Sequence, residues 1–152
     1  MGKICCFTGH REIYDSIEEI KNSLLKTVCE LVKEGFDEFR TGGAVGFDML
    51  AADAVLEAKK QFPKIRHVIY VPCITQNKYY TTEQNKKYLM HINSADRILA
   101  VSENYHVGCM HKRNRALADG SDVCVAYLRQ RNGGTAYTVK YAVSIGCEVK
   151  YL

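Results

Sequence analysis

The segment from Arg40 to Asp48 carries residues with a clear capacity for ligand chemistry. It reads Arg-Thr-Gly-Gly-Ala-Val-Gly-Phe-Asp, follows a short apolar run and precedes a helical pattern. A glycine-rich turn between a strand and a helix exposes backbone N–H groups beside the positive end of the helix dipole, where phosphates bind. A second turn of this kind, Gly133-Gly134-Thr135, precedes the last helical pattern. Two such turns predict an anionic ligand held from two sides.

Neither turn matches a standard nucleotide fingerprint. Residues 42–46 lack the G-x-G-x-x-G spacing, and the next apolar run ends in Val71-Pro72-Cys73 without an acidic residue. No Gly-Lys-Ser/Thr sequence is present, so the turn is not a P-loop. The alternative interpretation is that these glycines only allow a strand and a helix to pack closely, and the sequence leaves both open.

Asp48 and the segment Thr8-Gly9-His10-Arg11 are candidates for contact with such a ligand. A carboxylate in a first helical turn can simply complement the helix dipole. Next to a phosphate it would be repulsive, so we expect Asp48 to face ribose hydroxyls or to hold the loop. Arg11 can pair with a phosphate through two hydrogen bonds, and we favour it over His10 as a ligand contact. Asp48 is also a weak catalytic candidate.

Two further candidates lie later in the chain. Within Lys112-Arg113-Asn114-Arg115, Arg113 and Asn114 can bind a phosphate or a base edge, although a charge run is more often a solvated helix face. Thr135 can donate its hydroxyl to a ligand or cap the helix that follows, and both roles are compatible. The spacing of His106, Cys109 and His111 matches no zinc motif, so no metal site is predicted.

The pattern along the chain alternates between strands and helices. Apolar runs predict strands at residues 3–7, 36–41, 66–71, 97–101, 123–128 and 147–152. Helical spacing predicts a helix from Asp15 or Ser16 to Gly35, and others over 49–62, 110–118 and 135–144. The polar, tyrosine-rich stretch that begins at Gln76 is expected to contain a loop and then a helix running to about Asn93. This order predicts a single α/β domain over residues 1–152, with a mostly parallel sheet and helices on both faces. Ligands in such folds bind beyond the carboxyl ends of the strands, where all the candidate turns lie.

Composition narrows the class of protein. The chain has 152 residues, is 47% hydrophobic and 25% charged, and carries a formal net charge of +4. This charge suits an anionic small molecule but is too weak to argue for nucleic acid. The seven cysteines are an odd number without a C-x-x-C pair, which indicates reduced, buried thiols. No signal peptide or membrane-spanning run is visible, so we expect a soluble cytoplasmic protein.

The order of these motifs resembles the YpsA-like family of the SLOG superfamily. The resemblance rests on residues 8–11, then 41–48, then Arg113-Asn114, then 133–138. It implies a Rossmann-like three-layer sandwich that binds nucleotides or nucleotide-derived ligands, with ADP-ribose-like molecules among them. Superfamily relatives include the LOG phosphoribohydrolases, which release a base from a nucleoside monophosphate, and DprA, which binds single-stranded DNA. Homo-oligomers are common among these relatives, so we expect one here.

The chain departs from the LOG enzymes at their catalytic acid. Their signature is P-G-G-x-G-T-x-x-E, and counting from Gly133 places Lys140 at the position of the glutamate. Cleavage of an N-glycosidic bond passes through an oxocarbenium-like transition state, which a carboxylate stabilises and a lysine opposes. Hydrolase activity is therefore not expected unless Asp48 or Glu103 substitutes.

We therefore predict a module that binds or senses a nucleotide-like small molecule, more plausibly without catalysis. No other cofactor, no membrane and no nucleic-acid partner are expected, with N-glycosidic hydrolysis and DprA-like binding of single-stranded DNA kept as alternatives. The predicted ligand-binding residues are Thr8, Gly9, Arg11, Gly42, Gly43, Ala44, Gly46, Asp48, Arg113, Asn114, Gly133, Gly134 and Thr135.

Overall fold

The alternation predicted from the sequence is present in the structure, a computed structural model that describes residues 2–152. In chain order the elements are β1 (Lys3–Gly9), α1 (Ile17–Lys33), β2 (Phe36–Thr41), α2 (Phe47–Gln61), β3 (Arg66–Val71), the 3-10 helix η1 (Gln76–Tyr79), α3 (Thr82–Ser94), β4 (Arg97–Ala100), α4 (Cys109–Ala118), β5 (Val123–Tyr127), α5 (Gly134–Ser144) and β6 (Glu148–Tyr151).

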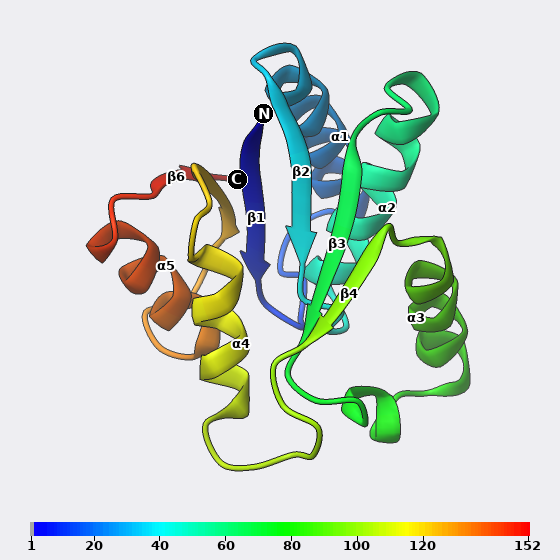
Figure 1. Ribbon diagram of the computed structural model, residues 1–152, viewed down its shortest axis with the longest axis vertical. Coiled ribbons are helices and arrows are strands. Elements are labelled where there is room, and N and C mark those ends of the chain that lie inside the picture. Colours follow the sequence, from blue (N-terminus) through cyan, green and yellow to red (C-terminus); the bar gives the residue numbers. More distant parts are fainter. Residues whose placement is uncertain (1) are drawn as a thin grey trace.

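The strands form one sheet in the order β4-β3-β2-β1-β5-β6, and every pairing in it is parallel. The chain moves from β1 outward to β4 and then returns to β5 and β6 on the other side of β1. Because such crossovers are right-handed, the first three helices cover one face and the last two cover the other. Figure 1 shows α4 and α5 grouped apart from α1, α2 and α3. The predicted α/β Rossmann-like sandwich is confirmed.

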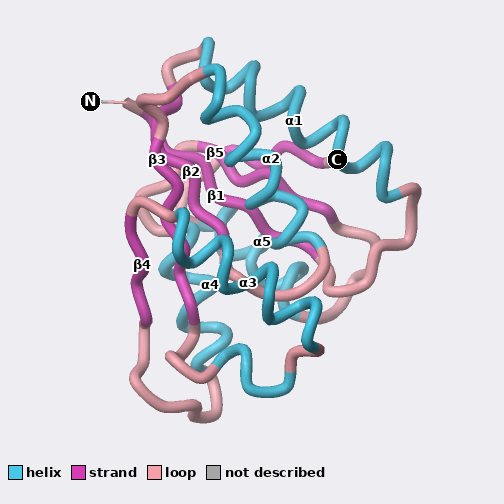
Figure 2. Tube along the Cα trace, turned by 90° about the vertical axis from the view of Figure 1, so that its right-hand side faces the viewer, coloured by secondary structure: helices cyan, strands magenta, loops and turns pink. Residues whose placement is uncertain are grey.

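Alternating residues of β1 anchor the two halves of the core. Cys5 and Phe7 pack with the buried faces of α1 and α2, whereas Cys6 packs with Leu117 of α4 and Ala142 of α5. Neighbouring residues of a strand point to opposite faces of the sheet, so these two clusters lie on opposite sides. Figure 2 shows α1 and α2 running side by side along one face of the strands.

β1 is longer than predicted, because pairing with β5 extends it. Thr8 pairs with Ala126 and Gly9 pairs with Tyr127, so both residues belong to the strand and not to the turn after it. A Cβ on Gly9 would lie 2.3 Å from the ring of Phe47. The glycine therefore lets the first residue of α2 pack directly against the end of β1.

Two of the helices begin with side-chain caps. Ser16, one of the two predicted caps, accepts a hydrogen bond from the Glu19 N–H at 3.3 Å at the start of α1. Thr81 and Gln84 form a reciprocal capping box at the start of α3. Within residues 2–152, none of the helices has both the length and the apolar character that crossing a bilayer requires.

Candidate functional site

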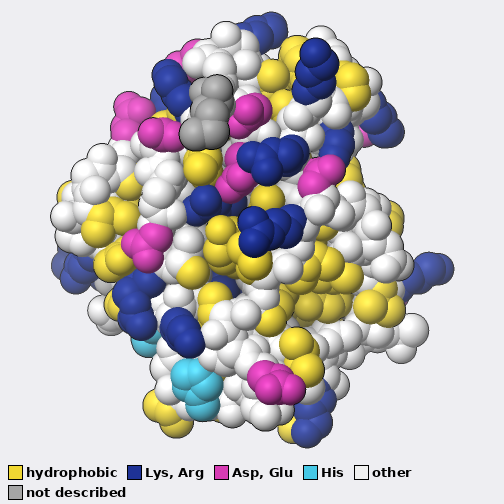
Figure 3. Space-filling model, viewed as in Figure 1, with side chains coloured by type: hydrophobic (Ala, Val, Ile, Leu, Met, Phe, Trp, Pro, Cys, Tyr) yellow, Lys and Arg dark blue, Asp and Glu magenta, His cyan; other side chains and the backbone are white. Residues whose placement is uncertain are grey.

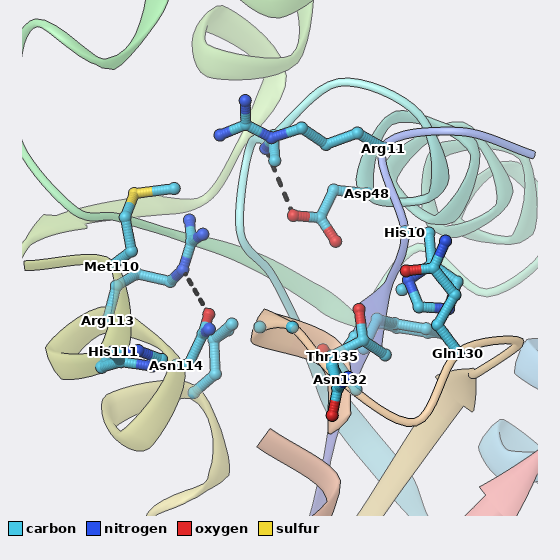
Figure 4. Close-up of a pocket in the computed structure, with 17 residues that line it drawn as sticks. His10, Arg11, Asp48, Met110, His111, Arg113, Asn114, Gln130, Asn132 and Thr135 are labelled. Atoms are coloured by element: carbon cyan, nitrogen blue, oxygen red, sulfur yellow. Dashed lines mark hydrogen bonds between the residues drawn. The ribbon is translucent and has the colours of Figure 1, made fainter. Parts of the chain in front are cut away.

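A pocket of about 410 Å³ lies at the carboxyl edge of the sheet, between the loops after β1, β2 and β5 and the first turns of α4 and α5. Figure 4 shows its polar side chains converging from these separate segments. Ten of the thirteen predicted positions line it, namely Thr8, Gly9, Arg11, Ala44, Asp48, Arg113, Asn114, Gly133, Gly134 and Thr135. The parallel sheet brings these segments together because it gathers all strand ends at one edge.

The first turn of α5 presents hydrogen-bond donors to the pocket. The helix begins at Gly134, after Gly133 at a φ of 101°, and no side chain caps it. The first N–H bonded back across this turn is that of Tyr137, which donates to the Gly133 carbonyl at 3.0 Å. The N–H groups of residues 134–136 precede it and have no partner within the helix. Thr135 is 6% exposed and points into the same space (Figure 4).

Arg113 acts inside the wall of the pocket and orients Asn114. The guanidinium is 4% exposed, and its Nη1 donates to the carbonyls of Gly42 and Tyr70. Its Nε donates to Asn114 Oδ1 at 2.9 Å. Because a guanidinium has donors only, Arg113 fixes the Asn114 amide with its oxygen toward the guanidinium. The amide nitrogen, Nδ2, is left free to donate. That nitrogen lies 3.5 Å from where a Cβ of Gly134 would be, so it faces the start of α5.

The glycines after β2 support the wall instead of lining the pocket. Gly46 has a φ of 82°, and a Cβ there would lie 2.1 Å from the backbone oxygen of Arg11. A Cβ on Gly42 would lie 2.6 Å from the carboxylate of Asp48, and the carbonyl of Gly43 accepts a hydrogen bond from Tyr80 Oη at 2.9 Å. The predicted ligand contacts of these three glycines remain predictions, whereas their close packing is visible.

Asp48 is the only carboxylate among the residues that line the pocket. It is 7% exposed, and its Oδ2 accepts a hydrogen bond from the Ala44 N–H at 3.2 Å, so it does hold the loop. Burial raises the pKa of this carboxyl to about 6, against the opposing effects of Arg113, the Ala44 N–H and Arg11. In Figure 4 the second carboxylate oxygen points into the pocket. An acid with a pKa near neutrality at a pocket is a feature of functional sites.

Arg11 and His10 have different surroundings. Arg11 is exposed, and its side chain extends over Asp48 at the mouth of the pocket (Figure 4). His10 also lines the pocket, but its Nε2 lies 2.8 Å from the Arg129 backbone N–H and accepts a hydrogen bond from it. Burial and the charge of Arg129 lower the pKa of this imidazole. Its hydrogen bond ties the loop after β5 to the loop after β1.

Of the two carboxylates considered as substitutes for the catalytic acid, Asp48 lines the pocket and Glu103 does not. Lys140 and Glu103 are both exposed and do not line it. The helix starts at Gly134-Thr135, so counting the G-T-x-x-E signature from this pair moves the acid position to Thr138. Thr138 is fully buried and donates its hydroxyl to the Gly134 carbonyl at 2.7 Å. Neither count supplies a carboxylate.

The structure adds lining residues that sequence reasoning did not select. They include Met110, His111, Gln130 and Asn132, none of which was among the predicted ligand-binding residues. His111 packs against the ring of Tyr137, with 4.1 Å between ring centroids. The one feature of the sequence that could have identified these residues is that they follow the predicted strand ends. In the described part of the chain no three His, Cys, Asp or Glu side chains are grouped to hold a metal.

Comparison with known proteins gives consistent matches. A family model described as the YspA SLOG family matches residues 5–151. The uncharacterized SPbeta prophage-derived protein YoqJ of Bacillus subtilis (strain 168) is 32% identical over 137 residues, covering 82% of this chain and 80% of YoqJ. A UPF0398 protein of Halalkalibacterium halodurans is 26% identical over 129 residues, covering 83% of this chain and 68% of its own length.

Solved structures that share the fold include two DNA-processing proteins. DNA processing protein A from Helicobacter pylori, solved to explain its single-stranded DNA binding mode, has a TM-score of 0.74 at 22% identity. The match covers 99% of this chain but 65% of that one. DprA from Streptococcus pneumoniae has a TM-score of 0.71 at 16% identity, with 99% of this chain and 50% of DprA covered. At these identities the likeness concerns the fold alone.

Proposed function

Because the chain belongs to the YspA SLOG family, we propose that its pocket binds a nucleotide or a nucleotide-derived ligand such as an ADP-ribose-like molecule. One observation carries the proposal: the first turn of α5, Thr135 and the amide of Asn114 form a surface of hydrogen-bond donors. Such a surface at a helix N-terminus favours a phosphate. Arg11 at the mouth adds a positive charge that a diphosphate would meet.

The size of the pocket agrees with a ligand of this kind. Its volume of about 410 Å³ lies in the range of small-molecule sites, which is roughly 300–1,000 Å³. The proposal assigns phosphate contact to the α5 end, where Asn114 and the backbone of Gly134 and Thr135 lie. It gives Arg113 the role of holding Asn114, since the guanidinium is occupied by backbone carbonyls.

Thermal denaturation with inorganic phosphate, AMP, ADP and ADP-ribose tests the proposal. A ligand at 100 times its Kd adds about 2.7 kcal/mol to the free energy of unfolding, which raises Tm by roughly 5–10 °C for a domain of this size. Asn114→Asp replaces the donors by a carboxylate and should abolish the shift, while Asn93→Asp, on the exposed end of α3, should keep it. The absence of any shift at millimolar concentrations of all four compounds contradicts the proposal.

Hydrolysis of a nucleotide N-glycosidic bond is a second candidate, favoured by Asp48. This residue is a pocket carboxylate with a pKa raised to about 6, which suits stabilisation of a cationic transition state or proton transfer. Incubation with nucleoside monophosphates, followed by chromatography for free base, tests the activity. Release of base by the wild type and its loss in Asp48→Asn would support hydrolysis. Intact nucleotides after long incubation would exclude it for those substrates.

Binding of single-stranded DNA is a third candidate function. The fold comparison does not support the expectation that nucleic acid is not a partner. Tyr79 and Tyr105 are 88% and 69% exposed at the same edge as the pocket, where bases can stack on them. On the face in Figure 3, however, Lys and Arg side chains alternate with acidic and hydrophobic ones and form no continuous basic stripe. Anisotropy of labelled oligonucleotides with steep salt dependence, weakened in Tyr105→Ala but not in Tyr151→Ala at the β6 side, would support this candidate.

A homo-oligomer is part of the proposal and is supported by analogy with relatives of the superfamily. Native mass spectrometry of the purified protein reports the number of subunits and any ligand that co-purifies. A monomer over the micromolar range would contradict the expected assembly.

A further inference from the structure

The two ends of the pocket have opposite hydrogen-bonding character. At the α5 end, the groups that face the pocket are donors, from the backbone of Gly134 and Thr135 and from Asn114 Nδ2. At the α2 end, the buried side chain that faces it is Asp48, which when ionised can only accept, and the exposed Arg11 lies over it at the mouth. A ligand that bonds to both Asn114 and Asp48 therefore presents an acceptor at the α5 end and a donor deep at the α2 end.

The donor for Asp48 does not come from the protein. Within residues 2–152 the only hydrogen bond to this carboxylate is from the Ala44 N–H, which uses Oδ2. Arg113 donates to the carbonyls of Gly42 and Tyr70, and no hydrogen bond joins it to Asp48 within the described residues. Arg11, at the mouth of the pocket, attracts the carboxylate electrostatically, but no hydrogen bond joins the two side chains within the described residues. A nine-tenths buried carboxylate whose second oxygen faces a cavity is incompletely satisfied, and such groups acquire partners.

The chemistry of that partner follows from the charges around it. A second phosphate at Asp48 would repel the carboxylate, and an ammonium group would be repelled by Arg11 and by the positive end of α5. A neutral hydroxyl donates one hydrogen bond without either penalty. In a ligand whose phosphate occupies the α5 end, the hydroxyls nearest the phosphate are those of the sugar.

We propose that Asp48 accepts a hydrogen bond from a ribose hydroxyl, so that the site selects ribonucleotides over deoxyribonucleotides. The inference rests on the proposed nucleotide-binding function and assigns its ligand class. An exocyclic amino group of a base is a neutral donor as well, and it is the competing partner that the experiment separates from the sugar.

Calorimetric Kd values for AMP, 2′-deoxy-AMP, 3′-deoxy-AMP and ribose 5-phosphate test the inference. Loss of a hydrogen bond to a charged group weakens binding by about 10- to 100-fold, so at least one deoxy analogue should bind that much more weakly than AMP. Ribose 5-phosphate should keep the preference over 2- or 3-deoxyribose 5-phosphate, because the base takes no part. Asp48→Ala should bind AMP as weakly as the wild type binds the deoxy analogue, and it should lose the discrimination.

Controls separate this inference from the function on which it rests. Asp37→Asn removes a carboxylate at the opposite edge of the sheet, at the start of β2, and should leave the discrimination intact. Asp48→Asn keeps an oxygen for the Ala44 N–H and serves if Asp48→Ala does not fold. Equal Kd values for AMP and both deoxy analogues, discrimination that survives in the Asp48 variants, or a preference that depends on the base would overturn the inference while leaving nucleotide binding in place. If neither phosphate nor any of these compounds binds, the proposed function and the inference both fail.

Discussion

Replacing Asp48 by asparagine should stabilise the ligand-free protein. Burial raises the pKa of this carboxyl from 3.8 to about 6, so the folded state holds its proton more tightly than the unfolded state does. The sign follows from linkage: between pH 3.8 and 6 the folded state binds more protons, and stability falls as pH rises through that window. Above it the ionised carboxylate costs the fold about 3 kcal/mol, at about 1.4 kcal/mol per unit of pKa. Asparagine removes this cost and keeps an oxygen for the Ala44 N–H.

Urea denaturation of the wild type and Asp48→Asn from pH 4 to pH 8 measures the effect. We expect the variant to be more stable by up to about 3 kcal/mol at pH 8, with a gain that shrinks toward zero near pH 4. Asp37→Asn, at the opposite edge of the sheet, controls for the general loss of one negative charge. A variant less stable than the wild type at pH 8, or a gain that does not change with pH, would refute the reasoning. A stabilising change that removes ligand binding would indicate that Asp48 is kept for function.

Three further predictions concern the stability of the fold. Burial lowers the pKa of the fully buried His67 to about 4, so stability should fall as pH drops from 6.5 to 4, by up to about 3 kcal/mol, and urea titrations of His67→Gln should show a flatter pH profile. Gly120→Ala should cost about 1–2 kcal/mol from its positive φ alone, and Gly46→Ala about 2 kcal/mol more because its Cβ meets backbone; equal Tm values would contradict this. Arg113→Lys should lower stability by about 2–4 kcal/mol, because an ammonium cannot hold both carbonyls and Asn114 at once, and an unchanged urea midpoint would contradict that.

Local patterns predicted the order and positions of the elements because each depends on neighbouring residues. Period-2 and period-3.6 spacing marks strands and helices, and Ser16 marks where the first helix begins. The end of β1 was misplaced because Thr8 and Gly9 are held in the strand by β5, more than a hundred residues away. Sequence spacing also assigned Lys140 to the place of a catalytic acid, whereas the start of α5 assigns that place to Thr138.

By itself, the sequence determined that the chain is a parallel α/β protein whose polar turns meet at one edge of the sheet. Only the tertiary structure decided what each residue does there. The glycines of the first turn pack against Arg11 and Asp48 instead of lining the pocket. The guanidinium of Arg113 donates to backbone carbonyls in the wall of the pocket. Burial of Asp48, and hence its pKa near 6, also follows from these contacts. The physical reason is that backbone conformation is set by near neighbours, whereas burial, hydrogen-bond partners and pKa are set by groups brought together from distant parts of the chain.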